Sequence, residues 1–170
     1  MKNRAKKIIN TALLGSALLC SPLVQAETVT IDMQLPALNT SKYQRPFVAV
    51  WVEQKGQRQA VKTVSVWFDD KKWLKDIRRW WRKAGRYDQA VDAVTGATKP
   101  PGKYQLQWDG TDLQGNALPA GEYTLYLEAV REHGNRTLLK QKVTLGAGKV
   151  QEYTLTAGDE LGPVSIRVGD

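Results

Sequence analysis

Residues 47–53 read Phe-Val-Ala-Val-Trp-Val-Glu, a nearly continuous apolar run with the length of a β-strand. A strand that carries apolar side chains on both faces must be covered on both faces, as the central strand of a sheet is. Residues 55–57, Lys-Gly-Gln, suit a hairpin connection, and residues 61–68 alternate as a return strand. The run therefore predicts the middle of a sheet with packing layers above and below it.

Further strand patterns precede and follow this hairpin. Residues 28–35 alternate between apolar and polar side chains and stop at Pro36. After residue 102 the strand pattern returns in five more segments, which are 104–108, 124–130, 137–145, 150–156 and 164–168. About eight short strands with turns at regular spacing predict a mostly β protein, an Ig-like β-sandwich. The connection from Trp108 to Tyr123 resembles the matching hairpin in the Ig-like domain of flagellar hook-cap proteins, which implies a fold and no function.

One inserted amphipathic helix interrupts the strands. Asp69 or Asp70 can cap its start and Gly85 can end it. At about 100° per residue, the apolar side chains share one arc and most cations lie opposite, so we expect the arc to pack on a sheet face. The arc contains Trp73, Leu74, Ile77, Trp80, Trp81 and Ala84, and the opposite side contains Lys72, Lys75, Arg78, Arg79, Arg82 and Lys83.

A loop follows the helix and has the sequence Asp92-Ala93-Val94-Thr95-Gly96-Ala97-Thr98. Gly96 permits a positive φ and Ala97 adds almost no bulk, so a hydroxyl at Thr98 would have small neighbours. Asp92 can accept hydrogen bonds from the amides of the turn, and Thr95 can cap it. Helix and loop together form one excursion from the sandwich, at about residues 69–102, so we expect the loop to be exposed. The simplest interpretation is a connector that begins with an Asx-turn.

The pattern Asp-x-x-Thr-Gly-Ala-Thr also resembles the acceptor sequence of proteins that carry FMN on a threonine through a phosphoester bond. The resemblance implies that FMN is the cofactor, that Thr98 is the acceptor, and that Asp92, Thr95, Gly96 and Ala97 belong to its site. It also implies a partner, an FAD:protein FMN transferase that splits FAD with Mg²⁺ and transfers the FMN half.

The tryptophans and arginines near this loop have three interpretations. In the first, the aromatic rings pack on the sheet and the cations are solvated. In the second, Trp67, Trp73, Trp80 or Trp81 stacks near the isoalloxazine ring, and Arg78, Arg79, Arg82 or Arg86 balances the phosphodiester or docks an acidic redox partner. In the third, the helix lies on anionic membrane lipid.

The N-terminus has the pattern of a secretory signal. Four cations precede an apolar run at residues 8–19, and Val24-Gln25-Ala26 suits cleavage before Glu27. Cleavage would remove those four cations and the only cysteine, Cys20, so the mature chain has no disulfide and a smaller net charge than the +8 of the whole sequence. We therefore expect a single domain at 27–170 that does not span the membrane and has little reason to bind nucleic acid.

Other candidate sites are weaker. His133 is the single histidine and lies in a turn, where we expect it to be solvated. Asp109 and Asp112 lie in a Gly-containing turn, and we expect them to bind backbone amides and not calcium. The sequence contains no hydrolase signature and no phosphate-binding glycine loop, so it does not indicate an enzyme with its own catalytic residues.

The order of features along the chain is similar to that of an uncharacterised bacterial family of exported Ig-like proteins. These features are the apolar run 47–53, the Arg-Arg-Trp-Trp helix, the acceptor pattern and the Trp-Asp-Gly hairpin. Members are typically encoded beside PepSY-type membrane proteins and FAD:protein FMN transferases. The resemblance implies a periplasmic flavoprotein that exchanges electrons with a PepSY-type or other membrane redox protein. The alternative is a flavin-free Ig-like adaptor or assembly protein of a periplasmic membrane complex.

Overall fold

The computed structural model describes residues 27–40, 43–87 and 92–169. The expected signal sequence, residues 1–26, lies outside these ranges, together with Cys20 and the cleavage position after Ala26.

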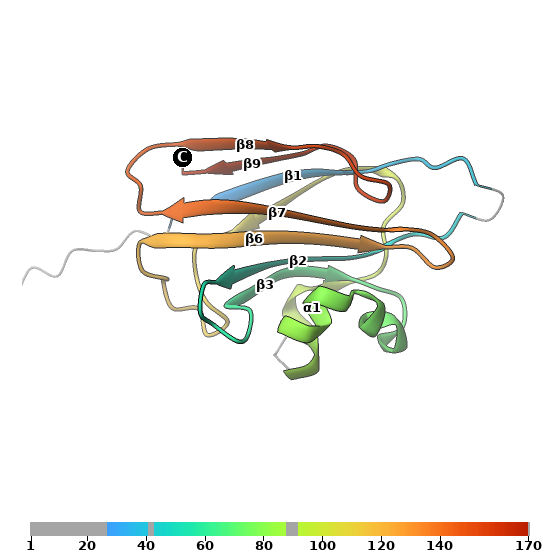
Figure 1. The fold of residues 1–170 in the computed structure, drawn as a ribbon, viewed down its shortest axis with the longest axis horizontal. Coiled ribbons are helices and arrows are strands. Elements are labelled where there is room, and N and C mark those ends of the chain that lie inside the picture. Colours follow the sequence, from blue (N-terminus) through green and yellow to red (C-terminus); the bar gives the residue numbers. More distant parts are fainter. Residues whose placement is uncertain (1–26, 41–42, 88–91, 170) are drawn as a thin grey trace, which may run out of the picture.

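Within the described part of the chain, nine strands form two sheets that face each other as a β-sandwich (Figure 1). One sheet has the order β5-β1-β9-β8, with β1 (Val29–Leu35), β5 (Gly102–Trp108), β8 (Gln151–Leu155) and β9 (Val164–Val168). The other has the order β4-β3-β2-β6-β7, with β2 (Phe47–Gln54), β3 (Lys62–Trp67), β4 (Thr95–Gly96), β6 (Gly121–Val130) and β7 (Arg136–Leu145). The prediction of a mostly β sandwich is confirmed. All eight expected strands are present, and the ninth, the two-residue β4, lies inside the expected acceptor loop.

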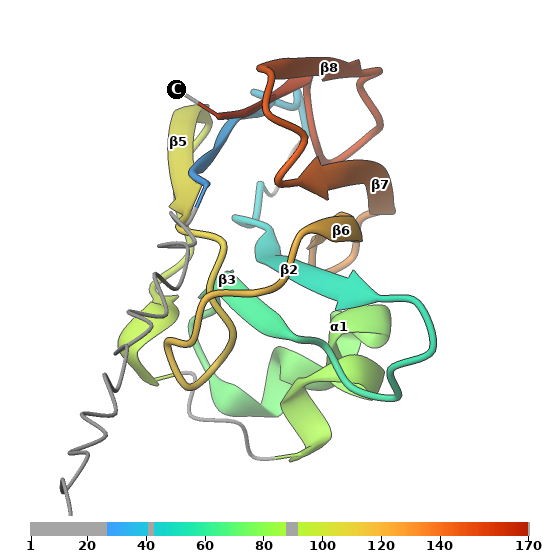
Figure 2. The same ribbon diagram turned by 90° about the vertical axis from the view of Figure 1, so that its left-hand side faces the viewer.

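Strand β2 is buried along both faces, as its apolar run predicts. Val48, Val50 and Val52 face the other sheet and have at most 1% of their surface exposed. Phe47 and Trp51 face the opposite way and pack under the helical segments. Figure 2 shows these segments on the outer side of the five-stranded sheet, away from the second sheet. The structure therefore has three layers at β2.

The helical excursion is divided, whereas the sequence predicts one continuous helix. It consists of a 3-10 helix, η1 (Lys71–Asp76), a short α-helix, α1 (Arg78–Lys83), and a further 3-10 turn, η2 (Gly85–Tyr87). Asp70 caps the first segment, because its carboxylate accepts a hydrogen bond of 2.9 Å from the amide of Lys72. The helical conformation is interrupted at Ile77, whose ψ of 70° is not helical.

A buried carboxylate explains the break. Glu128 of β6 has no exposed surface and accepts hydrogen bonds of 3.0 Å from the backbone amides of both Arg79 and Trp80. These are first-turn amides of α1, which have no carbonyl partner within a helix that begins at Arg78. The Arg136 guanidinium donates to the same carboxylate at 2.6 Å. Glu128 thus fixes the start of α1 on the sheet.

The two faces of the excursion mostly follow the predicted pattern. Leu74, Ile77, Trp80 and Ala84 are buried against the sheet, which confirms the apolar arc. The cationic side differs at two positions. Arg79 and Lys83 were expected in solvent, but they lie 2.8 Å and 3.7 Å from the largely buried carboxylate of Glu53.

Candidate functional site

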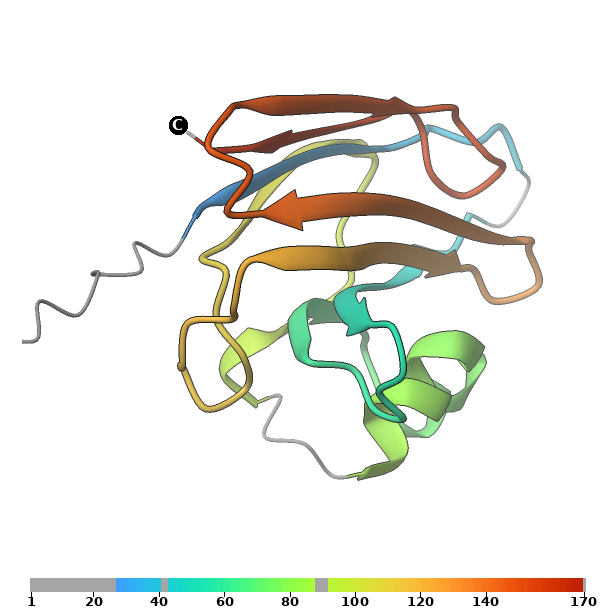
Figure 3. The same ribbon diagram turned by 60° about the vertical axis from the view of Figure 1, so that its left-hand side comes forward.

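The acceptor loop runs along the outer edge of β3. Its first residues form the 3-10 turn η3 (Asp92–Val94), and β4 then pairs with β3 in parallel, with Thr95 opposite Val66 and Gly96 opposite Trp67. The amide of Phe68 donates a hydrogen bond of 2.9 Å to the carbonyl of Gly96. In Figure 3 the yellow-green loop and the green helical segments lie on the same side of the molecule. The loop therefore closes an open sheet edge.

We call residues 95–101 the acceptor segment. Gly96 does not adopt the positive φ that glycine permits, and a side chain there would begin 3.4 Å from the Trp67 ring, an ordinary van der Waals contact, so the closed structure does not itself require glycine at this position. Asp92 starts η3, but its side chain lies outside what the structure describes, so its expected hydrogen bonds to the turn stay a prediction. Ala97 is exposed, as small residues at the tip of an excursion should be.

Thr98 is covered, in contrast to the expectation of an exposed acceptor. Only 5% of its surface is accessible. Its Oγ1 donates a hydrogen bond of 2.7 Å to Oδ1 of Asp69, and its amide donates to the same oxygen at 3.3 Å. Asp69 itself is exposed and lies where β3 leads into η1. The sequence suggested Asp69 only as a helix cap, and the structure assigns that role to Asp70.

Asp69 and Asp70 are thus adjacent in the chain but bind different partners. Asp70 binds the amide of Lys72, and the Lys72 ammonium lies 3.3 Å from its other oxygen. The hydrogen bond from the Lys72 amide lowers the pKa of Asp70, because it stabilises the charged carboxylate. Asp69 binds Thr98 instead, so the two residues offer a matched pair for mutagenesis.

A cation and two aromatic rings surround the acceptor segment. The Lys99 ammonium lies 5.2 Å from the centroid of the Trp67 ring and 5.8 Å from that of Tyr104. The two rings meet edge to face at 5.3 Å, and the Tyr104 hydroxyl donates a hydrogen bond of 2.7 Å to the carbonyl of Pro100. Lys99 could have been proposed from its place next to Thr98. Tyr104 could not, because its approach to Trp67 depends on how the two sheets meet.

The helical tryptophans pack on the sheet. Trp80 has no exposed surface, and its indole Nε1 donates to the Thr63 hydroxyl at 3.1 Å, so no external ring can reach it in this conformation. Trp73 stacks on Phe47 at 6.1 Å, and Trp81 is partly buried in the same cluster. Of the tryptophans suggested for flavin stacking, Trp67 has described contacts with the acceptor segment, through Gly96 and Lys99, but only 4% of its surface is exposed in this conformation.

The arginines suggested for the phosphodiester have different environments. Arg79 binds Glu53 and the Tyr126 hydroxyl, with its guanidinium 4.2 Å from the Tyr126 ring centroid. Arg86 lies over the ring of its neighbour Tyr87. Arg78 and Arg82 are exposed on α1, which leaves them available for a partner.

The residues of the acceptor segment fit covalent FMN in their chemistry. They provide a hydroxyl to esterify, small neighbours and a cation next to the acceptor, and the rings of Trp67 and Tyr104 lie beside the segment. The closed position of Thr98 does not leave space for an attached group, so the fit requires the segment to move.

Other features give no second site. Asp109 and Asp112 accept hydrogen bonds from amides of their own turn, as expected, and the Asn116 amide lowers the pKa of Asp112 by binding its charged form. His133 is exposed in the β6–β7 turn. Among the residues that the structure describes, no cluster of three or more metal-ligating side chains occurs.

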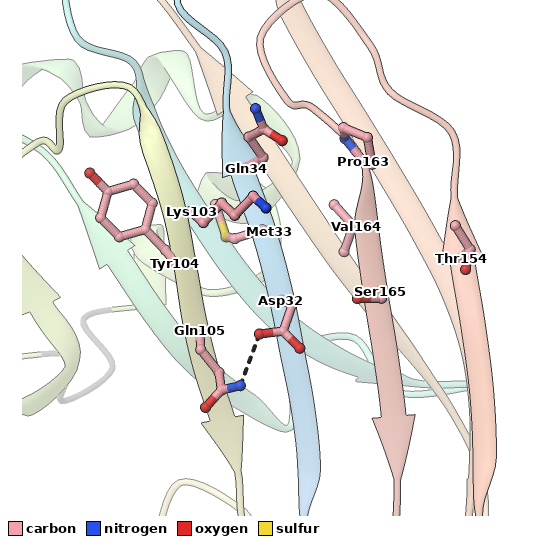
Figure 4. Close-up of a pocket in the computed structure, with 10 residues that line it drawn as sticks. All are labelled: Asp32, Met33, Gln34, Lys103, Tyr104, Gln105, Thr154, Pro163, Val164 and Ser165. Atoms are coloured by element: carbon pink, nitrogen blue, oxygen red, sulfur yellow. Dashed lines mark hydrogen bonds between the residues drawn. The ribbon is translucent and has the colours of Figure 1, made fainter.

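A shallow hollow of about 640 Å³ lies on the outer face of the four-stranded sheet (Figure 4). Its lining is mixed, with the polar side chains of Asp32, Lys103, Gln105, Thr154 and Ser165 next to Met33, Tyr104, Pro163 and Val164. Asp32 accepts a hydrogen bond of 2.9 Å from Gln105. The residues that line this hollow include neither histidine nor cysteine, and its carboxylate, Asp32, lies opposite Ser165 in the strand register and is hydrogen-bonded to Gln105.

Comparison with known proteins identifies a family. A family model described as "Predicted periplasmic protein (DUF2271)" matches residues 28–163. Searches of curated proteins and of solved structures gave no match. In the described ranges no helix has the length and apolar character needed to cross a membrane.

Proposed function

The chain belongs to the DUF2271 family of periplasmic proteins, and from this premise we propose that it is a flavoprotein electron carrier with FMN esterified to Thr98. The observation that carries the proposal is the acceptor segment. It places a hydroxyl at the end of an Asp-x-x-Thr-Gly-Ala-Thr pattern, on the edge of the sandwich and beside Lys99 and Trp67.

The attachment step is a phosphoryl transfer with FAD as donor and a separate FAD:protein FMN transferase as catalyst. Thr98 Oγ1 forms a bond to the phosphorus of the FMN half. The bond from that phosphorus to the oxygen of AMP breaks, and AMP leaves with the electron pair. The proton of the Thr98 hydroxyl is released, and no atom is oxidised or reduced. The attached flavin supplies the redox chemistry, and the protein supplies the tether and the electrostatic environment.

Lys99 and the two rings have clear roles in this proposal. The Lys99 ammonium is next to the acceptor and can balance the negative charge of a phosphodiester at Thr98. Tyr104 is half-buried and Trp67 is covered, so the apolar, polarisable surface of the Trp67 ring would reach a flavin only after the acceptor segment moves. Both rings belong to the sandwich, so their positions are fixed by the core.

The wild-type protein tests the proposal directly. When produced with an FAD:protein FMN transferase and exported, it should gain the mass of one FMN group, retained after denaturation, and it should be yellow. The same protein made without a transferase is the control and should show the unmodified mass. Absence of the increment in the presence of an active transferase would contradict the proposal.

The covered position of Thr98 favours a second candidate, a flavin-free adaptor of a periplasmic membrane complex. This candidate predicts a colourless protein under the same conditions. It also predicts that binding to the complex is unchanged by Thr98→Ala, whereas electron transfer in the leading proposal requires the hydroxyl.

The exposed cations of the helical segments suggest how the carrier meets its redox partner. Lys71, Lys75, Arg78 and Arg82 are exposed, and in the described part of the chain none of them forms a salt bridge. The apolar arc beneath them is already buried on the sheet, so it is not free to enter a lipid bilayer. We call these four residues the basic surface and propose that it docks an acidic face of the partner.

Charge reversal at the basic surface should slow electron transfer. We expect Arg78→Glu with Arg82→Glu to lower the rate of flavin reduction by host inner-membrane vesicles by about tenfold at low salt, because steering by opposite charges accelerates encounter. The difference should shrink between about 0.01 and about 0.1 M salt, as the screening length falls from ~30 to ~10 Å. Flavin absorbance measures the rate. The control reverses Lys103 and Lys149, which are exposed on β5 and on the β7–β8 turn and form no described salt bridge, and an equal effect there would argue against a docking surface.

A further inference from the structure

Asp69 holds the proposed acceptor in a closed position that cannot persist once Thr98 is esterified. We infer that Asp69 is a latch on the acceptor segment, that the transferase acts on an opened form, and that the attached FMN keeps the segment open. This inference rests on the proposed function, and it adds a conformational step that the flavin site requires.

Esterification removes the proton that joins Thr98 to Asp69. Thr98 Oγ1 lies 2.7 Å from Asp69 Oδ1 because its hydrogen points at that oxygen. Esterification replaces this hydrogen with phosphorus. Two oxygens without a hydrogen between them would then face each other at the same distance, so the contact turns from attractive to repulsive.

Esterification would also place a negative charge next to the Asp69 carboxylate. A phosphodiester carries a negative charge and would be bonded to the atom that now touches the Asp69 carboxylate. Two cations follow on η1: the ammonium and amide of Lys72 are both held by Asp70, and the exposed Lys71 forms no salt bridge with Asp69 in the described part of the chain. Lys99 follows Thr98 in the chain and can go with the segment as it moves. Opening therefore separates two negative charges and leaves Lys99 beside the phosphodiester.

The covered position of Thr98 leaves no space for an attached flavin group. With 5% of its surface accessible, Thr98 has no free volume for a phosphoryl group and a ribityl chain, nor for entry into the transferase active site. Asp69, in contrast, is exposed. Only the Thr98 side of the contact has to move, and the exposed Ala97, after Gly96, gives the backbone a point at which to turn.

At its start the acceptor segment is held by the pairing of β4 with β3, which includes the 2.9 Å hydrogen bond from the Phe68 amide to the Gly96 carbonyl, and this part can stay in place when Thr98 moves. Beyond Gly96, two further contacts are described. The Tyr104 hydroxyl binds the Pro100 carbonyl, and the Lys99 ammonium lies above two rings without a hydrogen-bond geometry to lose. The contact with Asp69 is the one that esterification breaks directly. Asp69 is therefore the residue that sets how often the acceptor is open before modification.

Hydrogen exchange tests the latch without using redox activity. In the unmodified wild-type protein the Thr98 amide should be protected. In the flavinylated wild-type protein it should exchange at least tenfold faster, and the same acceleration is expected in unmodified Asp69→Ala. Asp70→Ala removes an equal charge at the next position and should leave the Thr98 amide protected. Unchanged protection in the flavinylated protein would overturn the inference.

The rate of flavin transfer gives the second test. With purified transferase, FAD and Mg²⁺, we expect Asp69→Ala to accept FMN about five- to tenfold faster than wild type, and Asp70→Ala to stay within about twofold. An equal or lower rate for Asp69→Ala would overturn the latch, and a lower rate would instead make Asp69 a residue that assists the transfer. If neither wild type nor Asp69→Ala accepts FMN, the proposed function fails instead, so the two failures are distinguishable.

Discussion

Thr98→Ala is expected to remove all covalent flavin from the protein while leaving it folded. The acceptor oxygen is a single atom, so its loss cannot be compensated by neighbouring backbone. The fold should tolerate the change, because the Thr98 side chain lies at the sheet edge and its only described partner is the exposed Asp69. The measurement is intact mass after production with a transferase, together with flavin fluorescence of the denatured protein.

Thr98→Ser is the matched control for this experiment. It keeps a hydroxyl at the same position and should retain most of the FMN. An FMN increment on Thr98→Ala would move the attachment point elsewhere, for example to Thr95, which precedes it by three residues in the same segment. Complete loss in both variants would indicate that the methyl group of Thr98, and not only its oxygen, is needed for recognition.

The strands could be predicted from the sequence because their signals are local. Alternation along β1 and the continuous apolar run of β2 each report which faces are buried, and both predictions agree with the structure. Strand β4 could not be found in this way. It is only two residues long, and it is a strand because the edge of β3 is open beside it, which depends on the arrangement of the whole sheet.

The interruption of the helix at Ile77 also could not be predicted from local sequence, because a distant residue causes it. Nothing between Lys71 and Lys83 breaks a helix, and the periodicity of the apolar arc continues through Ile77. The cause is Glu128, which lies about fifty positions away and offers the amides of α1 a better partner than water. The burial of Trp80 could be predicted from the arc, but the place where α1 begins could not.

In the candidate site, the features that are adjacent in sequence could be predicted, and the contact between distant residues could not. The acceptor pattern, its small residues and the neighbouring Lys99 are adjacent in sequence and could be proposed from it. The hydrogen bond from Thr98 to Asp69 joins residues 29 positions apart and reverses the expectation of an exposed hydroxyl. Accessibility depends on the packing of the whole chain, so a modification motif in the sequence can predict which group would react but not whether that group is exposed.

Glu128→Ala should be among the most destabilising single substitutions in this protein, at a cost of about 3–5 kcal/mol in the free energy of unfolding. It removes the acceptor for the amides of Arg79 and Trp80 and leaves the Arg136 guanidinium without its carboxylate. It also leaves a cavity at a position with no exposed surface. Glu128→Gln keeps the volume and one carbonyl oxygen, so a smaller loss of about 1–3 kcal/mol is expected.

Urea unfolding followed by tryptophan fluorescence measures this loss, and Glu122→Ala provides the control. Glu122 lies on the same strand, but its ion pair with Lys142 is exposed on both sides, so its removal should cost at most about 1 kcal/mol. If Glu128→Ala stays within about 1 kcal/mol of wild type, Glu128 does not hold α1 on the sheet. If the large loss is found, the carboxylate that interrupts the helix is also what anchors it. Arg78 and Arg82 of the basic surface then keep their place because a buried acid binds the backbone of α1, and in the described part of the chain their own side chains form no salt bridge.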